Sequence, residues 1–264
     1  MTTLNTANAV GAGDAATVTA TATANTFHIL RLRLQKKEHG RFISHLDLMR
    51  AFERTVRRLQ LPVALTEGFH PHYRISFGPA LPLGASSSAE YCDLILTARP
   101  EQSALLEKIG RHLPPGLSLI DGSYIDNGQS LSDFIMRASY RVRLAIGDFA
   151  TAEELIALGK RILESEQFPI ETETRKGLRT IDLRSGIDQA QWAVSGEELI
   201  CDLFLAAGSA NNLKPQDALI PFIRKGAAPN ELHRAGLYGK SGQNWADPFG
   251  NVLLKWPEVK IEGE

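Results

Sequence analysis

The chain has 264 residues, the length of one large domain or of two ordinary ones. A hydrophobic fraction of 43% and a charged fraction of 22% exclude a fibrous or wholly disordered protein. The net charge of −1 gives no global preference for nucleic acid. The two distant cysteines, Cys92 and Cys201, exclude a disulfide scaffold, a cysteine-based zinc site and an iron–sulfur cluster held by this chain alone.

Residues 1–26 are rich in alanine, threonine and asparagine. This composition buries too little apolar surface to offset the entropy of ordering the chain, so we expect a disordered leader. The leader lacks the basic residues of a secretory signal or an organelle transit peptide. No apolar run in the chain approaches the length of about 20 residues that crosses a bilayer. We therefore expect a cytoplasmic protein without a membrane partner.

From residue 27 onward the hydrophobic pattern is periodic. Alternation over 27–36 predicts a half-buried strand, and apolar spacings of three and four over 44–60 predict an amphipathic helix. The pattern then predicts short strands at 63–66 and 73–77, a strand at 90–97, a helix at 100–112 and a strand at 117–125. The order strand–helix–strand–strand–helix–strand is that of the split βαβ, or ferredoxin-like, arrangement.

The second half repeats most of this order. The pattern predicts strands at 140–146, 168–174, 178–183 and 199–205, an optional strand at 192–194, and helices at 151–165 and 214–223. We therefore predict an α+β protein with two tandem ferredoxin-like domains, 27–126 and 127–225, after the leader 1–26. Residues 226–264 are predicted to form an extended segment, which either packs across both domains through its aromatic residues or is a loose tail.

The charges are segregated along the chain. Residues 27–78 contain ten lysines and arginines against four acidic residues, a net charge of +6, so the remainder carries −7. Four arginines form one stripe on the predicted helix, two more project from the preceding strand, and one lies further on: Arg50, Arg54, Arg57, Arg58, Arg31, Arg33 and Arg74. Such a stripe is typical of a protein that binds a phosphate backbone, but it also fits an ordinary solvated helix face. Both interpretations stay open.

The stretch 66–90 has the densest set of turn residues and candidate functional side chains. Its motif residues are Gly68, Phe69, His70, Pro71, Ser76, Gly84 and Glu90. His70 and His72 are candidate metal ligands or general acid–base groups, but no neighbouring motif completes a metal site or supplies a nucleophile. The serines of 84–88 could cradle an anion, although they lack the lysine of a phosphate-binding loop. Glu90 could cap these serines or pair with an arginine.

Several of these segments together resemble one family. They are the run 42–50, the pair Arg57–Arg58, and the segments 61–63, 68–72, 75–77, 81–84 and 90–91. With them the chain resembles the radical-SAM-linked domain of unknown function DUF2344, specifically over 27–125 and more weakly to about 225. The resemblance implies a partner, because such domains are encoded beside, or fused to, a radical SAM protein. The chain lacks the CxxxCxxC motif of such an enzyme, so the partner would carry the S-adenosylmethionine and the iron–sulfur cluster.

Three functional hypotheses follow. The leading one is a non-catalytic accessory module that presents RNA (tRNA or rRNA) or another substrate, through its basic helix, to a separately encoded radical SAM enzyme. The second is a metal-independent RNA-processing enzyme in which His70, His72 or His45 moves protons and Arg74 stabilises the developing phosphorane charge. The third is a protein–protein scaffold in which the basic stripe binds an acidic partner surface.

Overall fold

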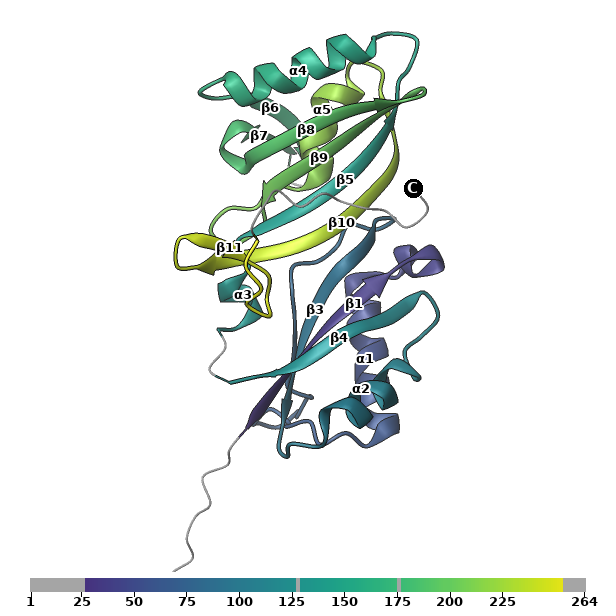
Figure 1. Cartoon of the computed structure of the whole chain (residues 1–264), viewed down its shortest axis with the longest axis vertical. Helices are drawn as coiled ribbons and strands as arrows, with labels where there is room; N and C mark the ends of the chain where they lie inside the picture. Colours follow the sequence, from purple (N-terminus) through teal and green to yellow (C-terminus); the bar gives the residue numbers. More distant parts are fainter. Residues whose placement is uncertain (1–26, 127–128, 175–176, 254–264) are drawn as a thin grey trace, which may run out of the picture.

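One large, mostly antiparallel sheet organises the protein. The computed structural model describes residues 27–126, 129–174 and 177–253. Nine strands form this sheet, with seven of them in the order β4-β1-β3-β10-β5-β9-β8, while β2 pairs with β3 and β11 with β10 (Figure 1). The α+β class is thus confirmed. The predicted leader 1–26 and the end of the predicted C-terminal segment lie outside the described residues.

The first half follows the predicted order of elements. It contains β1 (His28–Lys36), the 3₁₀ turn η1 (Glu38–Phe42), α1 (His45–Leu59), β2 (Ile75–Phe77), β3 (Ser86–Leu96), α2 (Gln102–Gly110) and β4 (Leu117–Ile125). Ser44 caps α1 by accepting a hydrogen bond from the backbone N–H of Asp47 at 3.2 Å. The predicted strand 63–66 forms only isolated bridges. The predicted strand 73–77 is shortened to β2.

The second half contains more regular structure than its pattern indicates. Its elements are α3 (Leu131–Phe134), β5 (Arg137–Ala145), α4 (Ala152–Glu164), β6 (Pro169–Thr174), β7 (Gly177–Asp182), η2 (Arg184–Gly186), β8 (Ile187–Ser195), β9 (Glu198–Ala206), α5 (Pro215–Ile223), β10 (Ala228–Ser241) and β11 (Asn244–Ala246). The hairpin β6–β7 forms a separate two-stranded sheet. A capping box at Thr151 and Glu154 begins α4.

Strand β10 requires a correction to the predicted C-terminal segment. Residues 228–241 form a regular strand in the middle of the sheet. The strand contacts both halves, so it is not a loose tail, and backbone pairing holds it in place where the sequence indicated only packing through aromatic residues. On one side β10 pairs antiparallel with β5, and on the other it pairs in parallel with the start of β3, where His233 lies opposite Ser86 and Arg234 opposite Ser87. The two halves therefore share one sheet, and two separate ferredoxin-like domains are not confirmed.

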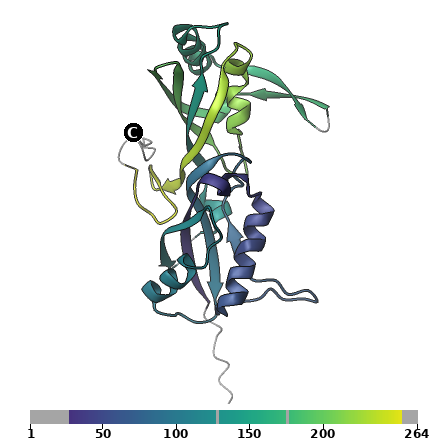
Figure 2. The ribbon, with the colours of Figure 1, turned by 90° about the vertical axis from the view of Figure 1, so that its right-hand side faces the viewer.

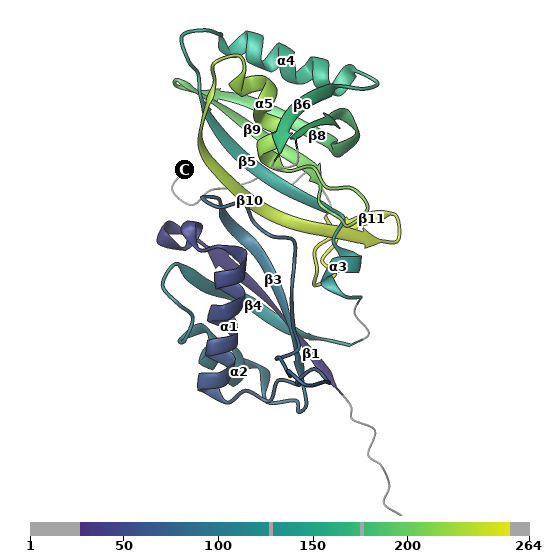
Figure 3. The same cartoon turned by 180° about the vertical axis from the view of Figure 1, so that it is seen from behind.

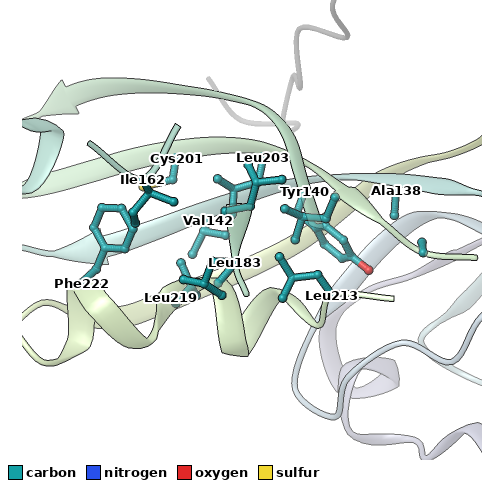
Figure 4. Close-up of a cluster of buried hydrophobic side chains, with 14 of the residues drawn as sticks. Ala138, Tyr140, Val142, Ile162, Leu183, Cys201, Leu203, Leu213, Leu219 and Phe222 are labelled. Atoms are coloured by element: carbon teal, nitrogen blue, oxygen red, sulfur yellow. The ribbon is translucent and has the colours of Figure 1, made fainter. Parts of the chain in front are cut away.

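Helices α1, α2 and α5 lie on the same face of the sheet (Figure 3). In the first half, Leu30, Leu32 and Leu34 point from β1 toward α1 and α2 and form one apolar core with Phe52 and Val56. In the second half, side chains from β5 and β9 pack against α5 in one apolar cluster, with Val142 next to Leu219 (Figure 4). The alternation of each strand thus directs its other side chains to the opposite face.

Candidate nucleic-acid interface

Helix α1 presents a basic surface because its apolar face packs against the core and its arginines lie on the opposite, outward side. Leu48, Phe52, Val56 and Leu59 are buried under the helix. On the outward side, Arg50, Arg54, Arg57 and Arg58 are all exposed, as the spacing predicts. We call these four residues the arginine stripe.

A groove runs along one edge of the arginine stripe. It has a volume of about 540 Å³ and lies between α1 and the segment 112–115 that follows α2. Arg54 and Arg58, one helical turn apart, line it together with Thr55 and His112. Arg58 Nη2 donates to the carbonyl of His112 at 2.8 Å, which holds that guanidinium at the groove wall.

The backbone next to the groove is fixed by a close approach of two glycines. A Cβ on Gly40 would lie 2.2 Å from the carbonyl oxygen of Gly116, a distance that no side chain can occupy. In addition, the N–H of Lys37 donates to the carbonyl of Gly116 at 3.1 Å. The segment that forms the groove wall is therefore held against η1.

The charge of the arginine stripe is largely uncompensated. Arg50 Nη1 lies 3.5 Å from Asp47 Oδ1 in an exposed pair. Within the described part of the chain, Arg54, Arg57 and Arg58 have no carboxylate at ion-pair distance. Three neighbouring guanidinium groups without counter-charges attract anions such as phosphates.

Arg31 and Arg33 do not belong to this surface, and their inclusion in it was wrong. They alternate with the leucines of β1 and so lie on the opposite face of the sheet from α1. Arg31 is 2% exposed and forms a bidentate pair with Asp93, both N–O distances being 2.8 Å. Arg33 is half-buried and bonds both carboxylate oxygens of Asp121 at 3.0 and 2.6 Å. Both arginines serve cross-strand ion pairs.

The predicted histidine site lies at the end of a projecting loop. Thr66 and His72 close this loop, because the Thr66 N–H donates to the His72 carbonyl at 2.8 Å and the His72 N–H donates to Thr66 Oγ1 at 3.0 Å. Phe69, His70 and Pro71 at its tip are exposed. In the described ranges no three histidine, cysteine or acidic residues are grouped as a metal would require.

The other three predicted residues, Arg74, Ser76 and Gly84, lie in separate places. Arg74 is exposed, with its guanidinium 4.8 Å from the ring centre of Phe27. Ser76 is an exposed residue of β2. Gly84 adopts a φ of +85°, which favours glycine, and donates from its N–H to the carbonyl of Arg41 at 2.9 Å. The structure does not bring these residues together with His70 and His72 into one catalytic arrangement.

Glu90 pairs with an arginine, which was one of its two predicted roles, and the partner comes from the other half. Arg234 is fully buried, and its Nε and Nη2 both donate to Glu90 Oε1, the former at 3.0 Å. Its Nη1 donates to the carbonyl of Pro79 at 2.9 Å. Lys36 lies nearby, buried, with Nζ donating to the carbonyl of Ile43 at 2.6 Å; burial lowers the pKa of this lysine. This buried polar cluster joins the two apolar cores.

A second cluster on the opposite face was missed by the sequence analysis. His233 is 6% exposed, and its two ring nitrogens lie 2.8 Å from Ser86 Oγ and 3.1 Å from Ser88 Oγ. These serines begin β3, so they are strand residues and not an anion-binding loop. Nothing in the sequence near 233 could have indicated the contact, because it joins residues 145 or more positions apart.

Burial lowers the pKa of His233 to about 4, with Lys37 and Arg141 adding to the decrease and Glu90 opposing it. The unfolded imidazole, with a pKa of about 6.5, takes up a proton at higher pH than the folded one. The contribution of neutral His233 to the free energy of unfolding is therefore complete above pH ~6.5 and is lost as the pH falls toward 4. We expect His233 to cost about 2 kcal/mol of unfolding free energy between pH 7 and pH 5.

Denaturant titrations at both pH values measure this loss. Between pH 7 and pH 5, the free energy of unfolding of the His233→Gln variant should decrease by about 2 kcal/mol less than that of the wild type. An equal decrease in variant and wild type would contradict the assigned environment of His233.

Comparison with known proteins identifies the family. The profile of uncharacterised proteins conserved in bacteria, DUF2344, matches residues 30–215. The chain belongs to the DUF2344 family. The arginine stripe, the groove and the projecting loop all lie within the matched range, whereas β10, with Arg234 and His233, lies beyond it. Among curated proteins, none is significantly similar to this DUF2344 protein.

Similarity to solved structures is distant. The chain is 12% identical to a protein in the crystal structure of a Cbf5–Nop10–Gar1 complex, with a TM-score of 0.45 over 79% of this chain and 48% of that one. It is 13% identical to a protein in an H/ACA RNP bound to a substrate RNA containing 2′-deoxyuridine, with a TM-score of 0.41 over 78% and 46%. The DUF2344 protein thus spans about half the length of these chains, and likenesses at this level transfer no function.

No helix in the described part of the DUF2344 protein combines the length and the apolar composition needed to cross a membrane.

Proposed function

We propose that this protein is a non-catalytic accessory module that binds RNA along the arginine stripe and presents it to a separately encoded radical SAM enzyme. The observation that carries the RNA-binding part is the set of three exposed arginines, without carboxylate partners among the described residues, beside a groove of about 540 Å³. A polyanion is the ligand whose binding such a surface favours, because each neutralised phosphate releases a condensed counterion.

The link to a radical SAM enzyme rests on the resemblance of the sequence motifs. In this proposal the partner holds S-adenosylmethionine and the iron–sulfur cluster, both proteins are cytoplasmic, and the RNA is a tRNA or an rRNA. We also propose that each half is a repeat of one split-βαβ unit. The matching strand orders β4-β1-β3-β2 and β10-β5-β9-β8 support this, each with two helices between its strands.

Geometry favours the accessory role over RNA cleavage. His70 is exposed at the tip of the loop 66–72 and His72 is exposed where the loop closes, and within the described residues no hydrogen bond joins either ring to a carboxylate that would orient it. A general base needs a partner group that holds its ring in position. The hypothesis of a metal-independent RNA-processing enzyme therefore has no contact in the structure that supports it.

Reversing the charge of the arginine stripe tests RNA binding. We expect the variant Arg54→Glu/Arg57→Glu/Arg58→Glu to bind total cellular RNA at least about tenfold more weakly than the wild type at low salt. The dependence of affinity on salt should also become shallower, by about two units of log–log slope for three lost phosphate contacts on single-stranded RNA. Both are measured by filter binding across a salt series.

A matched variant controls for the total change of charge. Lys160→Glu/Arg179→Glu/Lys225→Glu makes the same change at exposed positions of the second half and should bind RNA much more like the wild type. If both variants lost RNA affinity equally, the loss would come from the change in net charge and not from the arginine stripe. If the wild-type protein bound no RNA at low salt, the proposal would fail and an acidic protein surface would become the ligand to seek.

A further inference from the structure

The loop 66–72 presents an aromatic ring that the fold itself does not use. The relative exposure of Phe69 is 102%, the largest among the large hydrophobic residues that the structure describes. Burying such a ring in a complex releases the water that covers it, so a complex gains the full benefit of its apolar surface. An isolated exposed aliphatic residue is ordinary on protein surfaces, but a fully exposed phenylalanine at the tip of a projecting loop is a typical contact residue.

The loop is shaped before any ligand arrives. A bridge between Leu65 and Tyr73 closes its base, above which the paired bonds of Thr66 and His72 form a second rung. Gly68 has a φ of +113°, which a residue with a side chain rarely adopts, and Pro71 has a fixed φ. Ordering the loop on binding therefore costs little conformational entropy.

The position of the loop connects it with the arginine stripe. The loop follows α1 after a short connection and projects beyond the end of that helix, on the side of the sheet that α1 covers (Figure 2). Arg57 and Arg58 belong to the last turn of α1, and Arg74 follows the loop. The loop contains a single acidic residue, Glu67. An exposed ring thus stands at the end of a positively charged surface.

We infer that Phe69 is a stacking platform for an unpaired base, so that the ligand of the arginine stripe is single-stranded RNA. This inference rests on the proposed function. Phosphates of the strand contact the arginines of α1, while a base near one end of the bound segment stacks on the Phe69 ring. Bases in a duplex already stack on one another, so only an unpaired nucleotide can use the ring.

The wild type, three variants of Phe69 and two RNA probes test the inference. The probes are a fluorescein-labelled, unstructured 16-nucleotide RNA and the duplex of the same sequence, and binding is followed by fluorescence anisotropy. We expect the wild type to prefer the single strand and Phe69→Ala to lose about tenfold in affinity for it, within the range known for base–aromatic stacking. Duplex binding should not change. Phe69→Trp should retain affinity, whereas Phe69→Leu should lose it, because leucine is apolar but has no ring face.

The control is Leu178→Ala. Leu178 is 76% exposed and lies on the hairpin β6–β7 of the second half, outside the proposed interface. Its variant should bind both probes as the wild type does.

Each remaining outcome decides a different point. If Phe69→Ala bound the single strand as the wild type does while the arginine variant lost binding, the stacking role would be wrong and the proposed function would stand. Full affinity of Phe69→Leu would exclude stacking in favour of a simple apolar contact. If the wild type bound neither probe, both proposals would fail, and the loop would then fit an apolar pocket on a protein partner.

Discussion

The Arg234→Met variant should unfold with a free energy about 3–5 kcal/mol lower than that of the wild type. Arg234 is fully buried and donates to Glu90 and to the carbonyl of Pro79. Removing its guanidinium leaves the carboxylate of Glu90, which is 6% exposed, without its main partner and without water. Denaturant titration with a check for a single cooperative transition measures the loss.

A double variant separates the unpaired charge from the loss of packing. Glu90→Leu/Arg234→Met leaves no unpaired carboxylate at this site, so it should be more stable than Arg234→Met alone although it lacks one more native residue. A loss below about 1 kcal/mol in Arg234→Met, the size of an ordinary substitution, would contradict the burial of the pair.

The consequences of this pair reach beyond one contact. Glu90 lies in β3 of the first half and Arg234 in β10 of the second, and the parallel pairing of these strands involves only His233 and Arg234 opposite Ser86 and Ser87. Because this ladder is short, the side-chain pair contributes to holding the two halves in one sheet.

Arg31→Met is expected to have an effect of similar size, about 3–5 kcal/mol, although the sequence places Arg31 in the same basic region as the arginine stripe. Its guanidinium bonds Asp93 twice and also donates to the carbonyls of Pro248 at 2.6 Å and Gln129 at 3.0 Å. Methionine cannot replace these bonds, and Asp93 would remain buried with an unpaired charge.

Arg57→Met is the matched control for Arg31→Met. Arg57 is exposed on α1, so its replacement should change stability by less than about 0.5 kcal/mol. We expect the opposite order for RNA: Arg57→Met should weaken binding, and Arg31→Met, measured at a temperature where it stays folded, should not. Equal stabilities of the two variants would contradict the placement of Arg31 on the far face.

The local elements were largely predictable because their signals are local. Ser44 and the apolar spacing of 44–60 indicate α1, whose observed range is His45–Leu59, and strand β4 has the predicted bounds 117–125. The exposure of the arginine stripe follows from the same spacing, since the apolar face of a helix determines which residues point away from the core.

Strand β10 was missed for an identifiable reason. Its pairing with β5 shifts register twice, between Pro229 and Glu231 and between Arg234 and Gly236, so the polar–apolar alternation that marks a strand is interrupted. The strand is also flanked by partners from both halves, which buries its polar residues His233 and Arg234 in specific contacts.

The sequence by itself determined the α+β class, the amphipathic helix with its outward arginines and the family motifs, because these depend on residues a few positions apart. Only the tertiary structure decided which arginines remain available to a ligand. Arg31 and Arg57 are the same residue type in the same basic segment, but one lies opposite Asp93 across a strand pair and the other faces outward from α1. Strand pairing joins residues such as Glu90 and Arg234, 144 positions apart, and no local pattern encodes which distant side chain will neutralise a charge.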